Sequence, residues 1–185
     1  AADMILTDDN FSTIVSAVKE GRGIYDNIRK CVKYLLSSNI GEVLTIFVAS
    51  LLGVIGLLNG EDTTPLAAMH LLWINLITDS LPAFGIGMEE AEEEIMNEKP
   101  RPKKEGFFAN GYAWKIVIEG IIIGGVTLAA YLIGEQVNHT VGQTMAFLTL
   151  SSTQLFHAYN VKSEHSVFSK KSYKNSFMNF AFLLG

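Results

Sequence analysis

The sequence predicts an all-α membrane protein: a polytopic helical bundle of four full transmembrane helices plus a truncated fifth, preceded by a short cytoplasmic segment. Three observations predict this class. The 185 residues are 49% hydrophobic, with a mean hydropathy of +0.27, which is rich for a soluble chain of this size. Several apolar stretches approach the ~20 residues needed to cross a bilayer. All 14 lysines and arginines fall on one side of the membrane if those stretches alternate in direction.

The first part of the chain reads as a polar region with helical character. Cap-type residues end at Asn10, and apolar residues then recur at helical spacing, which predicts an amphipathic helix that closes near Gly21 or Gly23. A second helical pattern begins at Ile24 and runs without a breaker into the first apolar stretch. We therefore expect a continuous stalk that leads into the membrane. The opening residues do not form a signal peptide pattern.

The predicted spans are four long apolar segments and one short one. The segment at 113–134 is the most apolar, whereas the one at 141–160 carries several polar residues and is expected to be buried among its neighbours. The last begins near Ser176 and is interrupted by the end of the chain. The predicted helices cover residues 35–58, 65–88, 113–134, 141–160 and 176–185.

Charge placement supports this layout. Short cytoplasmic loops retain Lys and Arg, and the loops at 59–64 and 135–140 contain Glu61, Asp62 and Glu135 but no base. The N-terminal region and the loop 89–112 are therefore predicted to be cytoplasmic. A soluble all-helical protein with a buried core is the alternative, although such a protein has no reason to segregate its charges in this way.

Composition also excludes several classes. A net charge of −5 and a pI of about 5.3, without a basic stripe, argue against binding to nucleic acid. The single cysteine, Cys31, excludes an internal disulfide. We find no glycine-rich phosphate loop or nucleophile motif, so the sequence contains no recognisable catalytic apparatus. The loop 89–112 has an acidic and then a basic run, which suits either docking on a cytoplasmic partner or a solvated loop.

Polar side chains within the first two predicted spans are the candidate site. Residues three or four apart share a helix face, and this spacing joins two residues of the first span and three of the second. A carboxylate at the centre of a membrane helix costs at least ~2.5–3.5 kcal/mol, and no base lies between Lys33 and Lys99 to balance it. A cation or protons must therefore compensate. The residues are Asn39, Glu42, Asn75, Thr78 and Asp79.

Oxygen donors of this kind match a hard cation such as Ca²⁺, whereas zinc would require His or Cys nearby. Pro82 should break backbone hydrogen bonds in the same helix, which would free carbonyls as ligands or create a hinge. The alternative is that these side chains only bond helix to helix. Gln154 on the fourth span suits a role as cation ligand and a role in bonding helix to helix equally well, whereas for His157 the helix-to-helix role is favoured.

Several long motifs resemble one family, in order and over essentially the whole chain. The chain looks like the carboxyl-terminal third of a P-type cation-transporting ATPase, and is most similar to the calcium pumps. The motifs are Ala2-Asp3-Met4-Ile5-Leu6-Thr7-Asp8-Asp9-Asn10-Phe11, Glu20-Gly21-Arg22-Gly23-Ile24-Tyr25-Asp26-Asn27-Ile28-Arg29-Lys30, Ser38-Asn39-Ile40-Gly41-Glu42-Val43, Trp73-Ile74-Asn75-Leu76-Ile77-Thr78-Asp79-Ser80-Leu81-Pro82 and Asn97-Glu98-Lys99-Pro100-Arg101.

This resemblance implies an organisation. Residues 1–20 would end the cytoplasmic phosphorylation domain, 21–34 would be the stalk, and 35–185 would be the C-terminal transmembrane domain, with helices five to eight of ten and part of the ninth. In similar pumps the positions of the five candidate residues coordinate the transported ion. Gln154 falls where two-site pumps have a glutamate, which puts a second calcium site in doubt, whereas Glu42 argues the other way.

The resemblance also implies an activity that this chain does not perform alone. The parent would be an ATP hydrolase that uses Mg²⁺ and ATP, forms an aspartyl phosphate elsewhere and moves Ca²⁺ out of the cytoplasm. Its partners would be the lipid bilayer, the remaining domains and helices one to four. Two alternatives stay open: a related pump for Mn²⁺, Na⁺ or H⁺, and a stand-alone, non-catalytic membrane protein that binds cations or regulates a pump.

Overall fold

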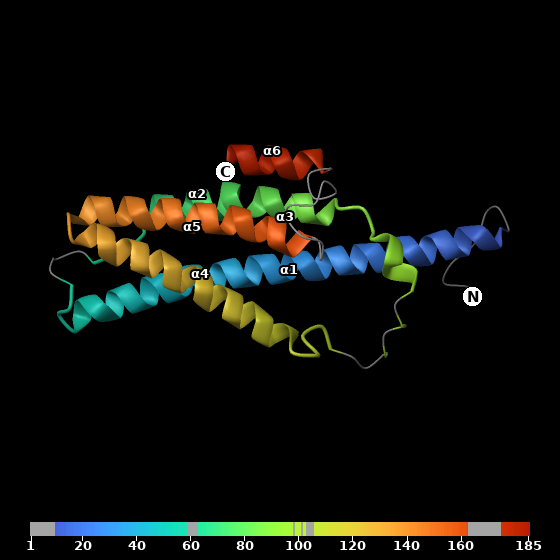
Figure 1. Ribbon diagram of the computed structural model, residues 1–185, viewed down its shortest axis with the longest axis horizontal. Helices are drawn as coiled ribbons and strands as arrows, with labels where there is room; N and C mark the ends of the chain where they lie inside the picture. The colour runs from blue at the N-terminus through green and yellow to red at the C-terminus, as the bar shows by residue number, and fades with distance from the viewer. Residues whose placement is uncertain (1–9, 59–62, 98, 101, 103–105, 163–174) are drawn as a thin grey trace.

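The computed structural model describes residues 10–58, 63–97, 99–100, 102, 106–162 and 175–185, and within these ranges the chain is all-helical, without a strand (Figure 1). Some of the residues used above lie outside the described ranges. They are the cap-type residues Thr7, Asp8 and Asp9, the acidic Glu61 and Asp62, and the basic Arg101, Lys103 and Lys104.

The first element is a single helix, α1, which covers Phe11–Val54 and is 44 residues long. It begins at a side-chain cap, where Asn10 Oδ1 accepts a hydrogen bond from the Ser12 N–H at 3.0 Å. It ends in a Schellman motif, in which Leu57 N–H donates to the Leu52 carbonyl at 3.0 Å. Gly56 supplies the left-handed turn of that motif, with φ of +74°, which favours glycine.

The expected end of a first helix near Gly21 or Gly23 is wrong, because α1 passes through both residues. A glycine inside a helix costs only about 1 kcal/mol relative to alanine, which a long helix can absorb. Gly23 also has a packing role: a Cβ placed there would lie 2.5 Å from Ala91 Cβ, whereas one at Gly21 would meet nothing within 4 Å. The glycine therefore permits close contact with the segment after the second predicted span.

The predicted span at 65–88 is helical but not uniform. It consists of α2 (Ala68–Trp73), a π-helical turn η1 (Ile74–Asp79) and α3 (Ser80–Gly87). The Ser80 hydroxyl donates to the Asn75 carbonyl, five residues earlier, at 2.8 Å. Pro82 follows and has no N–H to offer the Thr78 carbonyl. The interruption that the proline predicts is therefore present, and it takes a π-helical form.

The remaining helices agree closely with the predicted ranges. They are α4 (Tyr112–Glu135), α5 (His139–Lys162) and α6 (Ser176–Leu184). By length and hydropathy, two helices of the described chain are suited to cross a membrane, namely α1 and α4. The other two predicted spans differ because one is divided at the π-helical turn and the other, α5, is rich in polar residues.

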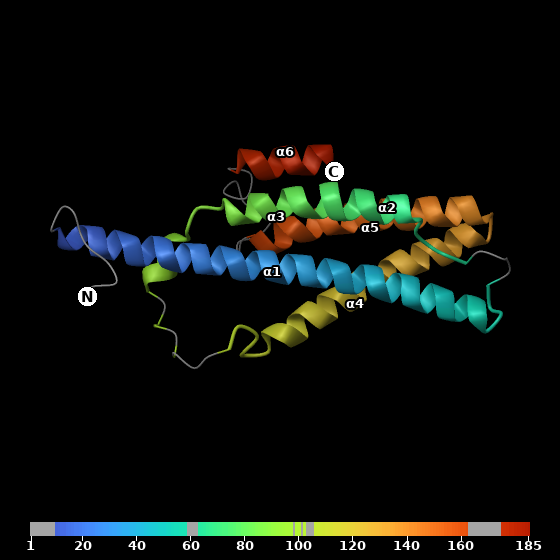
Figure 2. The same ribbon diagram turned by 180° about the vertical axis from the view of Figure 1, so that it is seen from behind.

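Helix α1 runs through the molecule, and its N-terminal part extends beyond the other helices (Figures 1 and 2). Helix α4 crosses it at glycines: a Cβ on Gly124 would lie 2.9 Å from the Gly41 carbonyl oxygen. Thr45 Oγ1 donates to the carbonyls of Gly41 at 2.8 Å and Gly124 at 3.3 Å. Small residues at this crossing allow the two backbones to approach closely. Helix α6 packs on α3.

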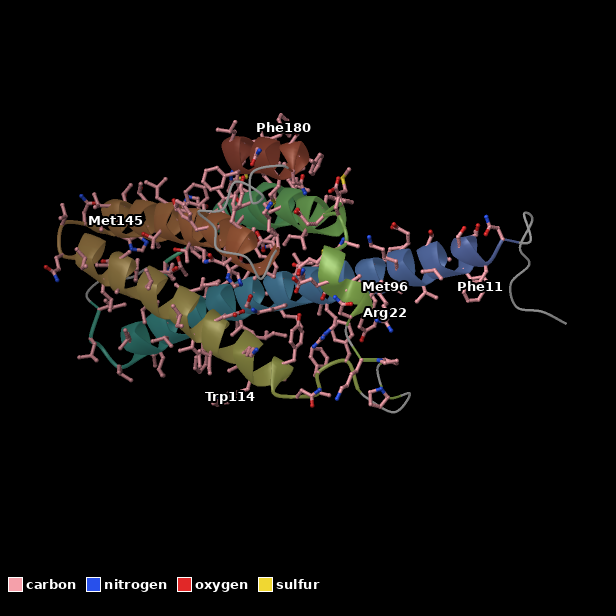
Figure 3. All side chains as sticks on the ribbon, turned by 45° about the vertical axis from the view of Figure 1, so that its right-hand side comes forward. Phe11, Arg22, Met96, Trp114, Met145 and Phe180 are labelled. Atoms are coloured by element: carbon pink, nitrogen blue, oxygen red, sulfur yellow. The ribbon has the colours of Figure 1, made fainter. Side chains whose placement is uncertain are left out.

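The segment after α3 docks on the extended part of α1. Asn27 Nδ2 donates to the Glu89 carbonyl at 2.7 Å, and Arg22 Nη1 donates to the Ile95 carbonyl at 2.9 Å. Figure 3 shows Arg22 beside Met96, the last residue of the short 3-10 helix η2 (Glu93–Met96). The acidic part of the loop 89–112 therefore contacts this chain's own stalk, which neither of the two sequence interpretations anticipated.

An ion pair strengthens this contact. Lys30 Nζ lies 2.7 Å from Asp26 Oδ2 and 3.3 Å from Glu92 Oε1. Burial acts to lower the pKa of Lys30, but its hydrogen bond to Asp26 and the charges of Asp26 and Glu92 outweigh this effect and hold the pKa above its usual value. Lys30 therefore stays charged at neutral pH and links α1 to the loop.

Candidate cation site

Polar side chains lie between two hydrophobic clusters, each of which contains residues of α1 and α5. One cluster contains Ala49 and Leu150, and the other contains Tyr34 and Ala158. Glu42 and Gln154 fall between these positions on their helices, and both are buried. The two clusters thus hold the helices together on either side of a polar layer.

Glu42 is the centre of this layer and is 5% exposed. Its Oε1 accepts a hydrogen bond from Gln154 Nε2 at 3.2 Å, and its Oε2 accepts one from Asn75 Nδ2 at 3.2 Å. Three helical segments therefore meet at one carboxylate. Gln154 is fully buried, and its Oε1 has no hydrogen-bond partner.

Asp79 is the second carboxylate and is 2% exposed, at the end of the π-helical turn. Its Oδ1 accepts from the Tyr34 hydroxyl at 3.2 Å, whereas its Oδ2 is buried without a partner. Thr78 is also fully buried, and its Oγ1 has no partner. Buried oxygens without partners are costly, and a bound cation would satisfy them.

Four of the six candidate residues are thus buried, Asn75 is exposed but donates to Glu42, and Asn39 is exposed without a hydrogen bond to the other five. Asn39 is exposed, and its Nδ2 donates to the Leu35 carbonyl of its own helix at 2.7 Å. Residues three apart on a helix differ by about 60° around its axis, so Asn39 lies at the edge of the face that Glu42 occupies. In this chain that edge is not covered.

Neither carboxylate has a basic partner. Among the ion pairs of the described residues, none involves Glu42 or Asp79. This agrees with the absence of any Lys or Arg between Lys33 and Lys99. The carboxylate oxygens of the layer are therefore available to a cation.

Sequence reasoning missed Tyr34. Its ring is fully buried, and its hydroxyl donates to the Thr78 carbonyl at 2.9 Å as well as to Asp79. The Thr78 carbonyl is the one that Pro82 cannot bond, so the tyrosine takes the place of the missing N–H. The available signal was a tyrosine at the start of an apolar run, since a buried tyrosine hydroxyl usually finds a partner.

Glu119 also differs from its expected arrangement. Its position alone, about one turn into the third predicted span, would let it reach the surface or pair with Lys115, one turn earlier on the same helix. Instead its Oε1 lies 2.6 Å from Lys33 Nζ of α1. The pair forms because α1 and α4 approach closely at their glycine crossing. Gly120 and Gly124, four residues apart in an apolar run, are the signal for such an approach, although they do not identify the partner helix.

These features are those of a helical membrane protein that holds polar groups between apolar helices. The family model described as "Cation transporting ATPase, C-terminus" matches residues 63–185. The chain belongs to this family of cation-transporting ATPases.

Individual relatives agree with this assignment. The chain is 44% identical over 181 residues to a calcium-transporting ATPase of Bacillus subtilis (strain 168), covering 96% of this chain and 19% of that protein. It is 41% identical over 204 residues to calcium-transporting ATPase 1 of Bacillus cereus (strain ATCC 10987 / NRS 248), covering 100% of this chain and 22% of the relative. An endoplasmic reticulum-type calcium-transporting ATPase 3 of Arabidopsis thaliana is 43% identical over 132 residues, with 71% of this chain and 12% of that protein covered. The chain thus spans about a fifth of the length of the bacterial relatives.

Proposed function

We propose that this chain is the ion-binding transmembrane part of an ATP-driven calcium pump. One observation carries the proposal: Glu42 and Asp79 are both buried, neither has a basic partner among the described residues, and Asp79 Oδ2 has no hydrogen bond there. Carboxylate, amide and hydroxyl oxygens are the ligands that Ca²⁺ prefers. The names of the relatives support Ca²⁺ as the transported ion.

The proposed ligands are Asn39, Glu42, Asn75, Thr78, Asp79 and, with its free Oε1, Gln154. Asn39 requires a neighbouring helix to enclose it, and the missing helices one to four of the parent would supply that cover. The parent would also supply the phosphorylated aspartate, the nucleotide site and the Mg²⁺ that ATP requires. In this arrangement residues 1–20 end the phosphorylation domain, 21–34 form the stalk and 35–185 form the transmembrane domain.

The proposed topology places four full spans and part of a fifth in the bilayer, with the N-terminal segment and the loop 89–112 in the cytoplasm. The positive-inside distribution of Lys and Arg supports it. Phosphorylation would act on the site through α1, which has no break between the stalk and Glu42.

The test uses the full-length pump that contains this chain, in native membranes or detergent, and measures phosphorylation by ATP as a function of free Ca²⁺. We expect Asp79→Asn to abolish Ca²⁺-dependent phosphorylation and Glu42→Gln to raise the half-saturating Ca²⁺ concentration at least about tenfold, because each removes a charged ligand worth ~1.5–3 kcal/mol. Glu94→Gln, which removes an exposed carboxylate, is the matched control.

Normal calcium dependence in both variants would refute the ligand assignment. Competition by Mn²⁺, Na⁺ or a change of pH on the same preparation distinguishes the ions, since oxygen ligands alone discriminate poorly among hard cations. An ion that replaces Ca²⁺ at lower concentration would identify the pump as one for that ion.

A further inference from the structure

A second polar cluster lies between α1, α4 and α5, and none of its members is a proposed ligand. Lys33 Nζ lies 2.6 Å from Glu119 Oε1, and Glu119 Oε2 lies 3.8 Å from His157 Nε2. The same imidazole nitrogen is 2.7 Å from Ser37 Oγ. The side chains of Lys33, Glu119 and His157 are 19%, 28% and 10% exposed, so the cluster is largely withdrawn from solvent.

Stability alone does not account for such a cluster. Charges lose hydration when they are buried, and replacing a buried ion pair with well-packed apolar side chains is often neutral or stabilising. Ser37, moreover, already donates to backbone carbonyls of its own helix, at 2.7 Å from Lys33 O and 3.0 Å from Tyr34 O. The cluster is therefore better explained by what it holds in place.

The imidazole contacts the tyrosine that binds Asp79. The ring centroids of His157 and Tyr34 are 5.9 Å apart, with 35° between the ring planes. Tyr34 is fully buried, and its hydroxyl donates to Thr78 O at 2.9 Å and to Asp79 Oδ1 at 3.2 Å. A tyrosine side chain turns about only two torsions, so a neighbour that fixes the ring also fixes its hydroxyl.

We propose that Glu119 and His157 are positioning residues for the cation site. Lys33 fixes Glu119, and the imidazole of His157 is set by two neighbours, the Ser37 hydroxyl at 2.7 Å and the charge of Glu119, whose Oε2 lies 3.8 Å away without a hydrogen bond. The imidazole in turn holds the ring of Tyr34. Through the Tyr34 hydroxyl the cluster holds Asp79 by one oxygen and leaves Oδ2 for the cation. This inference rests on the proposed function, because it assigns the cluster an effect on cation affinity.

The experiment is a double-mutant cycle in the full-length pump, with the half-saturating Ca²⁺ concentration and the maximal phosphorylation by ATP measured separately. Glu119→Gln keeps the shape of the side chain but removes its charge, and Tyr34→Phe removes only the hydroxyl. We expect each to raise the half-saturating Ca²⁺ about three- to tenfold, the scale of one lost hydrogen bond, with the maximal level unchanged. Because both act through the same bond, the double variant should resemble Tyr34→Phe alone.

Glu94→Gln is the matched control, since it removes an exposed carboxylate outside the cluster, and we expect no shift. If Glu119→Gln does not accumulate, Lys33→Gln breaks the same ion pair from the other side and should give the same shift. A loss of maximal phosphorylation or of thermal stability without a shift in calcium dependence would mean that the cluster is only structural. Additive effects of the two substitutions would also overturn the inference.

The same measurements keep this inference distinct from the proposed function. If Asp79→Asn leaves the calcium dependence intact, the cation site itself is wrong and the positioning role falls with it. If Asp79→Asn abolishes that dependence while Glu119→Gln leaves it unchanged, only the positioning role is refuted.

Discussion

The crossing of α1 and α4 permits a sharp test, because two adjacent glycines of α4 have different surroundings. A Cβ on Gly124 would lie 2.9 Å from the Gly41 carbonyl oxygen and 3.3 Å from Leu44 Cβ, whereas one on Gly125 would meet nothing within 4 Å. Gly124→Ala therefore forces backbone against backbone, and Gly125→Ala does not. The Thr45 hydroxyl, which bonds the carbonyls of both Gly41 and Gly124, would lose its geometry in the first variant only.

The magnitude follows from the difference between these variants. Both gain the helix propensity of alanine over glycine, about 1 kcal/mol, so this contribution cancels. What remains is the cost of overpacking, typically about 1–3 kcal/mol. Gly124→Ala should therefore be about 1–3 kcal/mol less stable than Gly125→Ala and should melt at the lower temperature.

The assay is loss of the monodisperse, detergent-solubilised full-length protein on heating, with both variants and the parent measured in the same detergent and lipid. Gly125→Ala should melt at or above the parent temperature. Equal melting temperatures for the two variants would show that the helices do not approach at Gly124 as the structure describes.

Two further substitutions test contacts at the stalk end of the bundle. Lys162 is fully buried, and its Nζ lies 3.5 Å from Glu89 Oε2. Lys162→Met should therefore lower the free energy of unfolding in denaturant by about 3 kcal/mol. An unchanged free energy of unfolding would contradict the ion pair. Gly23→Leu should displace the segment at Ala91, because a Cβ at Gly23 would lie 2.5 Å from Ala91 Cβ, whereas Gly21→Leu should not displace it. Limited proteolysis of the loop 89–112 should therefore be faster only in Gly23→Leu, and equal rates in the two variants would refute the contact.

Hydrophobic periodicity predicted the later helices well because it is a local signal. The ranges 113–134 and 141–160 agree with α4 and α5 within two residues, since a run of apolar residues bounded by polar turns defines a helix by itself. The predicted break at Gly21 or Gly23 failed because propensity is a weak signal that tertiary contact overrides, here the contact of Gly23 with Ala91. The π-helical turn was also outside the reach of periodicity, although Pro82 marked its neighbourhood.

The same distinction applies to the candidate site: the sequence predicted its local features but not its contacts between helices. Spacing predicted that Asn75, Thr78 and Asp79 share a face, and the structure buries the last two and leaves Asn75 exposed. The missing base predicted carboxylates without a basic partner, because that argument needs only positions along the chain. The bond of Tyr34 to Asp79 joins residues 45 apart, and that of Gln154 to Glu42 joins residues 112 apart. Such pairs depend on how the helices pack against one another, and the sequence pattern of one helix does not determine that packing.

The carboxylates of Glu42 and Asp79 belong to two different kinds of helix, which affects how each one moves when α1 tilts. Glu42 belongs to the unbroken α1, so from Asn27, where the loop docks, to Glu42 the helix rises about 22 Å at 1.5 Å per residue as one rod. Asp79 ends a π-helical turn and precedes Pro82, where helical hydrogen bonding is interrupted. A tilt of α1 therefore moves Glu42 and Tyr34 together, whereas Asp79 belongs to a separate segment that is linked to α1 by the hydrogen bonds of Tyr34 and by the bond from Asn75 to Glu42. In the proposed site, a displacement of the stalk would therefore change the separation of the two carboxylates, and with it the affinity for a cation that both bind.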